Sequence, residues 1–161
     1  MGNSESRSRA ERIADTLTKL QTPAADVWVA SAEISKDGRA LPYLVPLSLA
    51  WLDDRVVIAL DAESRTARNI VASRVCRLGL GPTRDVVMID AILEEAVKAN
   101  ETLPALADRY AAQADWDPRR ESGDYVYLVL RPNRIQAWRE ANELSGRTLM
   151  RDGRWVEGAS D

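Results

Sequence analysis

The chain has 161 residues, of which 45% are hydrophobic and 29% charged, and its formal net charge is −3. A chain of this length can bury a hydrophobic core in one domain. The weak negative charge provides no basic field for nucleic acid, so we expect no nucleic-acid partner and only a local anion site. With no histidine and one cysteine, Cys76, the chain lacks histidine-based triads, the usual zinc sites and an internal disulfide. We therefore expect no metal site, and among enzymes the composition favours chemistry carried by a bound cofactor.

The sequence also bears on location. No apolar run approaches the ~20 residues of a membrane span, and no charged-then-apolar secretory signal opens the chain. A lone cysteine suits a reducing compartment, so we expect a cytoplasmic protein with no membrane partner. The opening MGNSES matches the N-myristoylation pattern at Gly2 and Ser6. A solvated tail is the alternative, and the pattern leaves the modification of Gly2 open.

The first predicted elements are a helix and a β-hairpin. An amphipathic helix is expected at 7–21, where apolar residues recur at helical spacing and Pro23 ends the pattern. Strand formers then flank the turn signal KDGR at 36–39, which is typical of a hairpin. Pro42 and Pro46 each remove a ladder donor, so the second strand of this hairpin should be a sheet edge or be bulged.

Short strands and helices continue to the end of the chain. A helix is predicted at 64–73, and another at 101–113 that holds Leu103 and is followed by a polar loop at 115–124. The last long strand is expected to be interrupted at Pro132. The expected strands are 27–34, 41–52, 56–60, 75–81, 84–95 and 125–138, with a terminal hairpin after them. Six or seven strands with a few short helices predict an α+β fold, a β-barrel with helical additions.

One segment raises a chemical question. ESRTARNI places Ser64, Arg65, Thr66 and Arg68 at the start of a helix. The helix macrodipole makes that end positive, so two arginines there are mildly unfavourable unless an anion lies between them. Backbone amides, hydroxyls and cationic side chains are the groups that hold phosphate at such a site. A Ser64 cap with two solvated arginines is the alternative, and this segment alone leaves both open.

The surroundings of this segment resemble a known family. The stretch VVIALDAESRTARNIVASRVCRLGLGPTRDVVMIDAILEE is similar to the FMN-binding split barrels of the pyridoxamine 5′-phosphate oxidase-like superfamily, in which Ser-Arg-Lys or Ser-Arg-Thr opens a helix after a strand. The stretch RIQAWREANELSGRTLMRDGRW resembles the closing pattern of that family. The resemblance covers about residues 26–156 and implies a six- to seven-stranded antiparallel split barrel. We divide the chain into an N-terminal tail and helix (1–22), a split-barrel flavin-binding domain (23–156) and a C-terminal tail (157–161).

The resemblance also implies a site in a groove between the two subunits of a homodimer. The FMN phosphate would be held by Ser64, Arg65 and Thr66, with Arg68 in place of the lysine that the oxidases carry where Thr66 stands. The other implied cofactor contacts are Tyr43, Leu44, Val45, Pro46 and Leu47 along the isoalloxazine ring, Ala59 and Leu60 after the next strand, Asp85 near the ring, and Trp138 and Arg147, usually from the partner subunit. Taken alone, Asp85 would be a solvated turn residue, Trp138 a core residue and Arg147 part of a surface salt bridge.

The reaction is less defined than the site. True pyridoxamine phosphate oxidases carry an Arg-x-His substrate clamp where this chain has ANELSG, which argues against that activity. The resemblance implies a flavin-dependent oxidoreductase that transfers hydride to or from a small organic substrate, with no assigned catalytic residue and with Tyr43 as one possible proton donor. The alternatives are a reductase that uses an 8-hydroxy-5-deazaflavin coenzyme and a non-catalytic flavin- or ligand-binding protein. Retention of the implied contacts argues against a dimer without a cofactor.

The sequence also bears on two other cofactors. A deazaflavin with a polyglutamate tail would need a basic strip, for which Arg74, Arg77 and Arg84 are candidates. Haem is disfavoured because the chain has no histidine, although other axial ligands exist. The walls of the substrate pocket are expected from loops such as 114–124.

Overall fold

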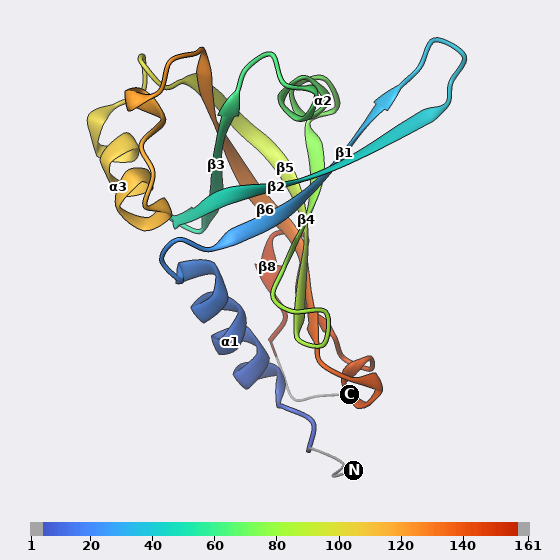
Figure 1. Cartoon of the computed structure of the whole chain (residues 1–161). Coiled ribbons are helices and arrows are strands. Elements are labelled where there is room, and N and C mark those ends of the chain that lie inside the picture. The colour runs from blue at the N-terminus through green and yellow to red at the C-terminus, as the bar shows by residue number, and fades with distance from the viewer. Residues whose placement is uncertain (1–4, 158–161) are drawn as a thin grey trace.

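The computed structural model describes residues 5–157, so Gly2 and its possible modification lie outside the described residues. Within that range the chain forms a barrel with three α-helices around it (Figure 1). The helices are α1 (Arg9–Gln21), α2 (Arg65–Ser73) and α3 (Pro104–Ala114), with 3₁₀ turns η1 (Pro118–Arg120) and η2 (Ala141–Glu143). The strands are β1 (Asp26–Ile34), β2 (Ala40–Leu52), β3 (Arg55–Asp61), β4 (Val75–Leu80), β5 (Val86–Lys98), β6 (Tyr125–Trp138), β7 (Thr148–Arg151) and β8 (Arg154–Trp155).

The barrel is antiparallel and closed. Its strand order is β3-β2-β1-β4-β5-β6, and β3 also pairs with β6, which joins the two edges. The β7–β8 hairpin continues from β6 as an addition to the six barrel strands of the described chain. The α+β barrel with helical additions that the sequence predicts is therefore confirmed.

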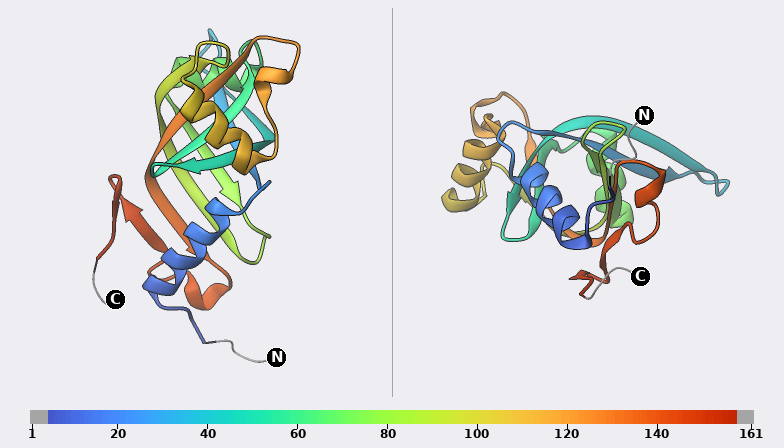
Figure 2. Two further views of the ribbon diagram at one scale, coloured as in Figure 1. Left: turned by 90° about the vertical axis from the view of Figure 1, so that its left-hand side faces the viewer. Right: turned by 90° about the horizontal axis from the view of Figure 1, so that it is seen from below.

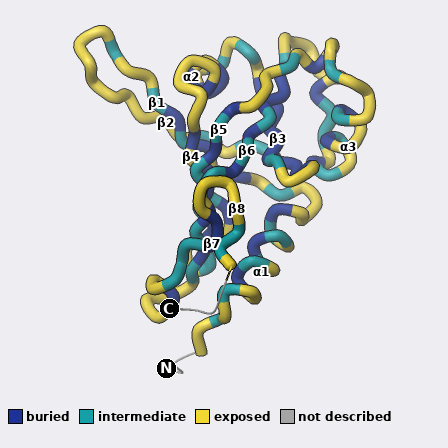
Figure 3. The backbone as a smooth tube through the Cα atoms, turned by 180° about the vertical axis from the view of Figure 1, so that it is seen from behind, coloured by how far each residue is buried: buried dark blue, intermediate teal, exposed yellow. Residues whose placement is uncertain are grey.

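The prolines act on the sheet as expected. Pro42 and Pro46 pair with β1, whereas β3 pairs with β2 only from Leu49 onwards. The first half of β2 is thus a sheet edge, and it extends with β1 as an exposed arm beyond the barrel (Figure 3). On β6 the register with β5 shifts at Pro132, which confirms the predicted interruption.

Helix α1 packs against one end of the barrel (Figure 2). Ser8 begins it with a capping box: the Ser8 hydroxyl accepts from the Glu11 amide, and the Glu11 carboxylate accepts from the Ser8 amide. Leu20 near its other end is fully buried in the main core. The helix therefore starts at Arg9, two residues later than predicted, because Ser8 serves as the cap.

Helix α3 covers a second, smaller core on the other side of β2 and β3. Tyr110 and Tyr127 are buried there with their rings edge to face, 5.2 Å apart. The prediction that this helix contains Leu103 is wrong. Pro104 occupies the first turn, so Leu103 precedes the helix and is 77% exposed. No helix within residues 5–157 has both the length and the apolar character needed to cross a bilayer.

Candidate functional site

A groove of about 550 Å³ opens between the edge strand β2, the end of β3, the start of α2 and the segment after α3. Nine of the predicted site residues line it, and they come from three separate elements. These nine are Tyr43, Val45, Pro46, Leu47, Ala59, Leu60, Ser64, Arg65 and Thr66. The fold therefore brings the helix start and the two strands together at one place.

The start of α2 forms one end of the groove. Ser64 is the N-cap, and its hydroxyl oxygen accepts a hydrogen bond of 3.2 Å from the Ala67 amide. The first intrahelical bond runs from the Arg68 amide to the Ser64 carbonyl. Amides before that bond have no acceptor within a helix, so those of Arg65 and Thr66 are available to a ligand. Ser64 can thus accept from the helix and still donate its own hydroxyl proton to an anion.

The two arginines of α2 differ in position. The guanidinium of Arg65 lies 5.0 Å from the centre of the Tyr43 ring and also reaches a second hollow of about 490 Å³ between α2 and the end of β1. Arg68 lines this second hollow and not the groove. No carboxylate of residues 5–157 forms an ion pair with either side chain. Arg65 is therefore a cation without an ion-pair partner at the groove, whereas Arg68 lines the neighbouring hollow.

Strand β2 gives the groove its long wall. Tyr43, Val45 and Leu47 are every second residue of the strand and so lie on one face. Ala59 and Leu60, at the end of β3, lie next to them. Leu44 projects to the opposite face and does not line the groove, whereas Pro46, which shares that face, does. The backbone of Leu44 remains part of the edge, but its side chain is turned away.

Five lining residues were missed by the sequence analysis: Asp26, Ser48, Asp61, Trp116 and Tyr125. The rings of Trp116 and Tyr125 meet edge to face at 5.5 Å and form an aromatic wall. Trp116 lies in the predicted polar loop, and the aromatic residues at either end of that loop were the available signal. Asp61 shapes the approach to α2, because its carboxylate accepts from the Glu63 amide at 2.7 Å.

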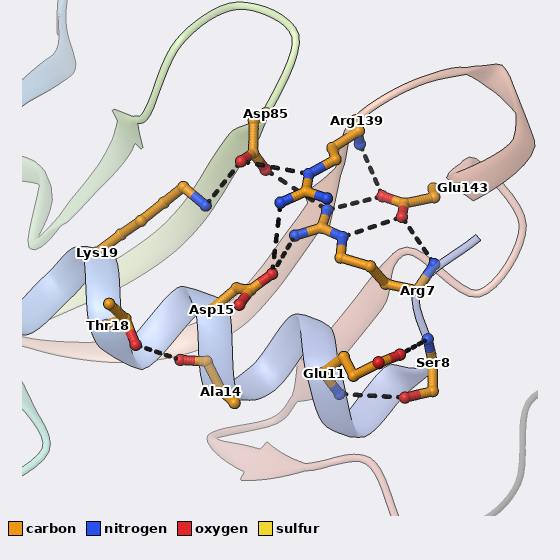
Figure 4. Close-up of polar contacts among 10 residues, drawn as sticks. All are labelled: Arg7, Ser8, Glu11, Ala14, Asp15, Thr18, Lys19, Asp85, Arg139 and Glu143. Carbon is orange, nitrogen blue, oxygen red and sulfur yellow. Dashed lines mark hydrogen bonds and ion pairs between the residues drawn. The ribbon is translucent and has the colours of Figure 1, made fainter. Parts of the chain in front are cut away.

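Asp85 lies away from the groove, in the β4–β5 turn at the α1 end of the barrel (Figures 1 and 4). Its carboxylate forms ion pairs with Lys19 at 3.1 Å, Arg139 at 3.4 Å and Arg7 at 3.5 Å. Asp85 is therefore neither a groove residue of its own chain nor a simple solvated turn residue. It ties α1 to the barrel.

Trp138 and Arg147 also lie outside the groove of their own chain. Trp138 ends β6, and the Arg147 guanidinium lies 5.5 Å from the centre of its ring. Both side chains are half-buried. This stacked pair fits neither a core tryptophan nor a surface salt bridge, the two roles that each residue alone suggested.

The register places Trp138 on the outer face of the sheet. Trp138 pairs with Val86, Met88 with Gly79, and Gly79 with Trp28. Antiparallel partners share a face and side chains alternate along a strand, so Trp138 and Trp28 project to the same side. This outer face also carries exposed apolar residues of neighbouring strands. They are Trp28 and Ile34 of β1, Leu44 of β2 and Val75 of β4, each at least half exposed.

The three arginines proposed for a basic strip are engaged elsewhere. Arg74 donates to the Leu93 carbonyl at 2.9 Å, Arg77 pairs with Asp90 at 2.6 Å, and Arg84 makes two bonds to Glu140 at 2.8 and 2.9 Å. None of the three lines the groove. No cluster of metal-ligating side chains occurs within residues 5–157 either.

Glu143, which forms an ion pair with Arg7 at 2.7 Å, predicts that the stability of the protein falls in acid. Glu143 is 3% exposed, and its pKa falls to about 2 because the Arg7 side chain donates to it. A lowered pKa means that this contribution is complete above the usual value of 4.5 and is lost as pH falls towards about 2. We expect the difference in unfolding free energy between wild type and Glu143→Gln to be largest near neutral pH and to shrink over that range. Urea unfolding at several pH values measures it, and a pH-independent difference would contradict the assignment.

Comparisons with known proteins bear on the fold. No family model matches the sequence, and no curated protein matches it. Among solved structures, an F420 reductase is 19% identical with a TM-score of 0.54, covering 73% of this chain and 94% of its own. A candidate pyridoxamine 5′-phosphate oxidase from Listeria innocua is 14% identical at 0.56, covering 79% and 98%. A heme binding protein from Mycobacterium smegmatis is 18% identical at 0.57, covering 91% and 59%.

These likenesses, together with the closed sheet, define an antiparallel split barrel with added helices. These solved structures share this fold, and the split barrel that the sequence resemblance implies is therefore confirmed. A shared fold does not determine the cofactor or the substrate, which must be argued from the site itself.

Proposed function

We propose that the protein is an FMN-dependent oxidoreductase that binds the cofactor in the groove at the start of α2. The observation that carries this proposal is the unpaired Arg65 at a capped helix start that opens into the groove. Free amides, a donor hydroxyl and a guanidinium are the groups that bind a phosphate.

The size and lining of the groove support binding of the whole cofactor as well as its phosphate. Its volume of about 550 Å³ lies within the roughly 300–1,000 Å³ of small-molecule sites. The edge of β2 offers backbone donors and acceptors beside apolar side chains, which suits a flat heteroaromatic ring with polar edges. The aromatic wall of Trp116 and Tyr125 would border the space left for a small organic substrate.

We infer a homodimer in which the outer apolar face is the interface. Exposed apolar side chains on neighbouring strands mark an interaction surface. Trp138 projects to this face, so docking of a second copy brings the Trp138–Arg147 pair to the partner. The partner's pair would then complete the groove, consistent with its absence from the groove lining of its own chain.

The bound flavin would supply hydride transfer. The protein would orient it through Ser64, Arg65 and Thr66, and would shield it from water with the aromatic wall and the partner subunit. Tyr43 lies on the β2 wall of the groove, where the isoalloxazine ring is proposed to bind, so its hydroxyl is the candidate for holding a proton near the flavin. We assign no catalytic residue.

A deazaflavin reductase is the second candidate, favoured by the similarity to an F420 reductase. The second hollow is lined by the two cations Arg65 and Arg68 and by one carboxylate, Glu33. Its net positive charge suits an anionic tail better than Arg74, Arg77 and Arg84 do.

The absorbance and mass spectra of the ligand that co-purifies test these proposals together. We expect yellow protein that carries FMN, is bleached by a reduced nicotinamide and is recoloured by air. A deazaflavin mass supports the second candidate. Flavin that no reductant bleaches supports a non-catalytic binding protein. Colourless protein that binds neither added FMN nor deazaflavin overturns both cofactor assignments.

A further inference from the structure

The loop between Trp138 and Arg147 is held by a buried carboxylate. Glu143 accepts four hydrogen bonds (Figure 4). The Arg7 amide and Arg7 Nε each donate to Oε1 at 3.0 Å, Arg7 Nη2 donates to Oε2 at 2.7 Å, and the Arg139 amide donates to Oε2 at 2.8 Å. All but one of these donors belong to the segment that leads into α1. The placement of the loop therefore depends on residues more than 130 positions earlier in the chain.

The backbone of the same loop is held from the same side. Ser6 donates to the Asn142 carbonyl at 3.0 Å, and Arg12 Nη1 donates to the Glu143 carbonyl at 3.3 Å. Arg12 is 4% exposed. A Cβ added to Gly146 would lie 3.5 Å from Arg12 Nη2, so the guanidinium also borders the residue before Arg147. The N-terminal segment thus contacts the loop along its length.

The ends of the loop carry the pair proposed to reach the partner's cofactor. The Ala137 amide donates to the Arg147 carbonyl at 3.0 Å, which fixes the base of the loop on β6. Between the base and η2 no strand pairing restrains the chain. The contacts from Arg7 and Arg12, together with those of Arg84 with Glu140 and of Asp85 with Arg139, supply the restraint that the sheet does not.

We propose that Arg7 and Glu143 are positioning residues that set the orientation of Trp138 and Arg147 towards the cofactor of the partner subunit. This inference rests on the proposed function, because it needs the pair to contact the flavin in a homodimer. Arg7 is suited to this role because its planar fork binds a carboxylate through two parallel hydrogen bonds. Loss of either partner would leave an uncompensated buried charge and release the loop.

The test is FMN titration of the full-length apoprotein dimer with Glu143→Gln and Arg7→Lys. Both variants keep the size of the side chain and weaken the fork. We expect FMN affinity to fall roughly three- to tenfold in each, since coupled residues of one network interact at that scale. The same substitutions made in a Trp138→Ala/Arg147→Ala background should have no further effect, because they act through these two residues. A purely structural role would lower affinity equally in both backgrounds, and that result overturns the proposal.

Glu11→Ala is the matched control, because it removes the capping-box acceptor of α1 without touching Glu143. It should lower the thermal midpoint and leave FMN affinity unchanged; an equal loss of affinity would count against a specific role of the Arg7–Glu143 pair.

If Glu143→Gln fails to fold, Arg7→Lys carries the test. If wild type and Arg147→Ala bind FMN equally, the partner contact of the proposed function fails. If they differ while Arg7 and Glu143 have no influence, only this inference fails.

Discussion

Replacement of Arg65 by alanine should weaken FMN binding roughly ten- to a hundredfold, because a hydrogen bond to a charged group contributes about 1.5–3 kcal/mol. The guanidinium has no ion-pair partner among residues 5–157, so its loss disturbs no internal salt bridge. Riboflavin lacks the phosphate and should lose much less affinity. Fluorescence titration of apoprotein with both ligands measures the two losses.

Arg68→Ala is the matched control for this result. Arg68 is on the same helix, is equally free of ion pairs and lines the neighbouring hollow and not the groove. We expect a smaller loss of FMN affinity than for Arg65→Ala. Equal losses for FMN and riboflavin in the Arg65 variant would contradict a phosphate role. A larger loss for Arg68→Ala would move the phosphate to the second hollow.

The strands and the helix start were predictable because their signals are local. Proline removes a ladder donor wherever it stands, so Pro42 and Pro46 indicated a sheet edge before the partner strands were known. Ser64 before an apolar stripe indicated a helix start. The closure of the barrel between β3 and β6 joins residues about 70 positions apart, and it followed from the family resemblance and strand count rather than from any local pattern.

The groove residues that were not predicted from the sequence are brought into place by tertiary contacts. Trp116 reaches it because α3 ends at a left-handed Asp115 and the chain then turns back towards β6, which no periodicity reveals. Asp85 was assigned to the ring from resemblance, and its three cationic neighbours come from the N-terminal segment, α1 and the end of β6. Pairings of this kind depend on how α1 packs, and its amphipathic stripe does not specify a partner.

Val75→Glu should abolish the dimer at micromolar concentration and with it most of the FMN affinity. Val75 is 53% exposed on β4, so an isolated subunit tolerates the change, since surface substitutions away from special features alter stability little. In an interface across a twofold axis, the same change places two carboxylates in an apolar contact. Like charges and buried unpaired ions cost several kcal/mol, which is a loss of more than about a hundredfold in association.

Leu103→Glu is the matched control for the dimer, because Leu103 is 77% exposed just before α3, outside the outer face of β1 and β4. This variant should remain dimeric in sedimentation velocity and bind FMN like wild type. The cofactor loss in Val75→Glu would follow from the absence of the partner's Trp138 and Arg147. A monomeric variant with full FMN affinity would therefore mean that one chain completes the groove alone, and a dimeric Val75→Glu would place the interface on another surface.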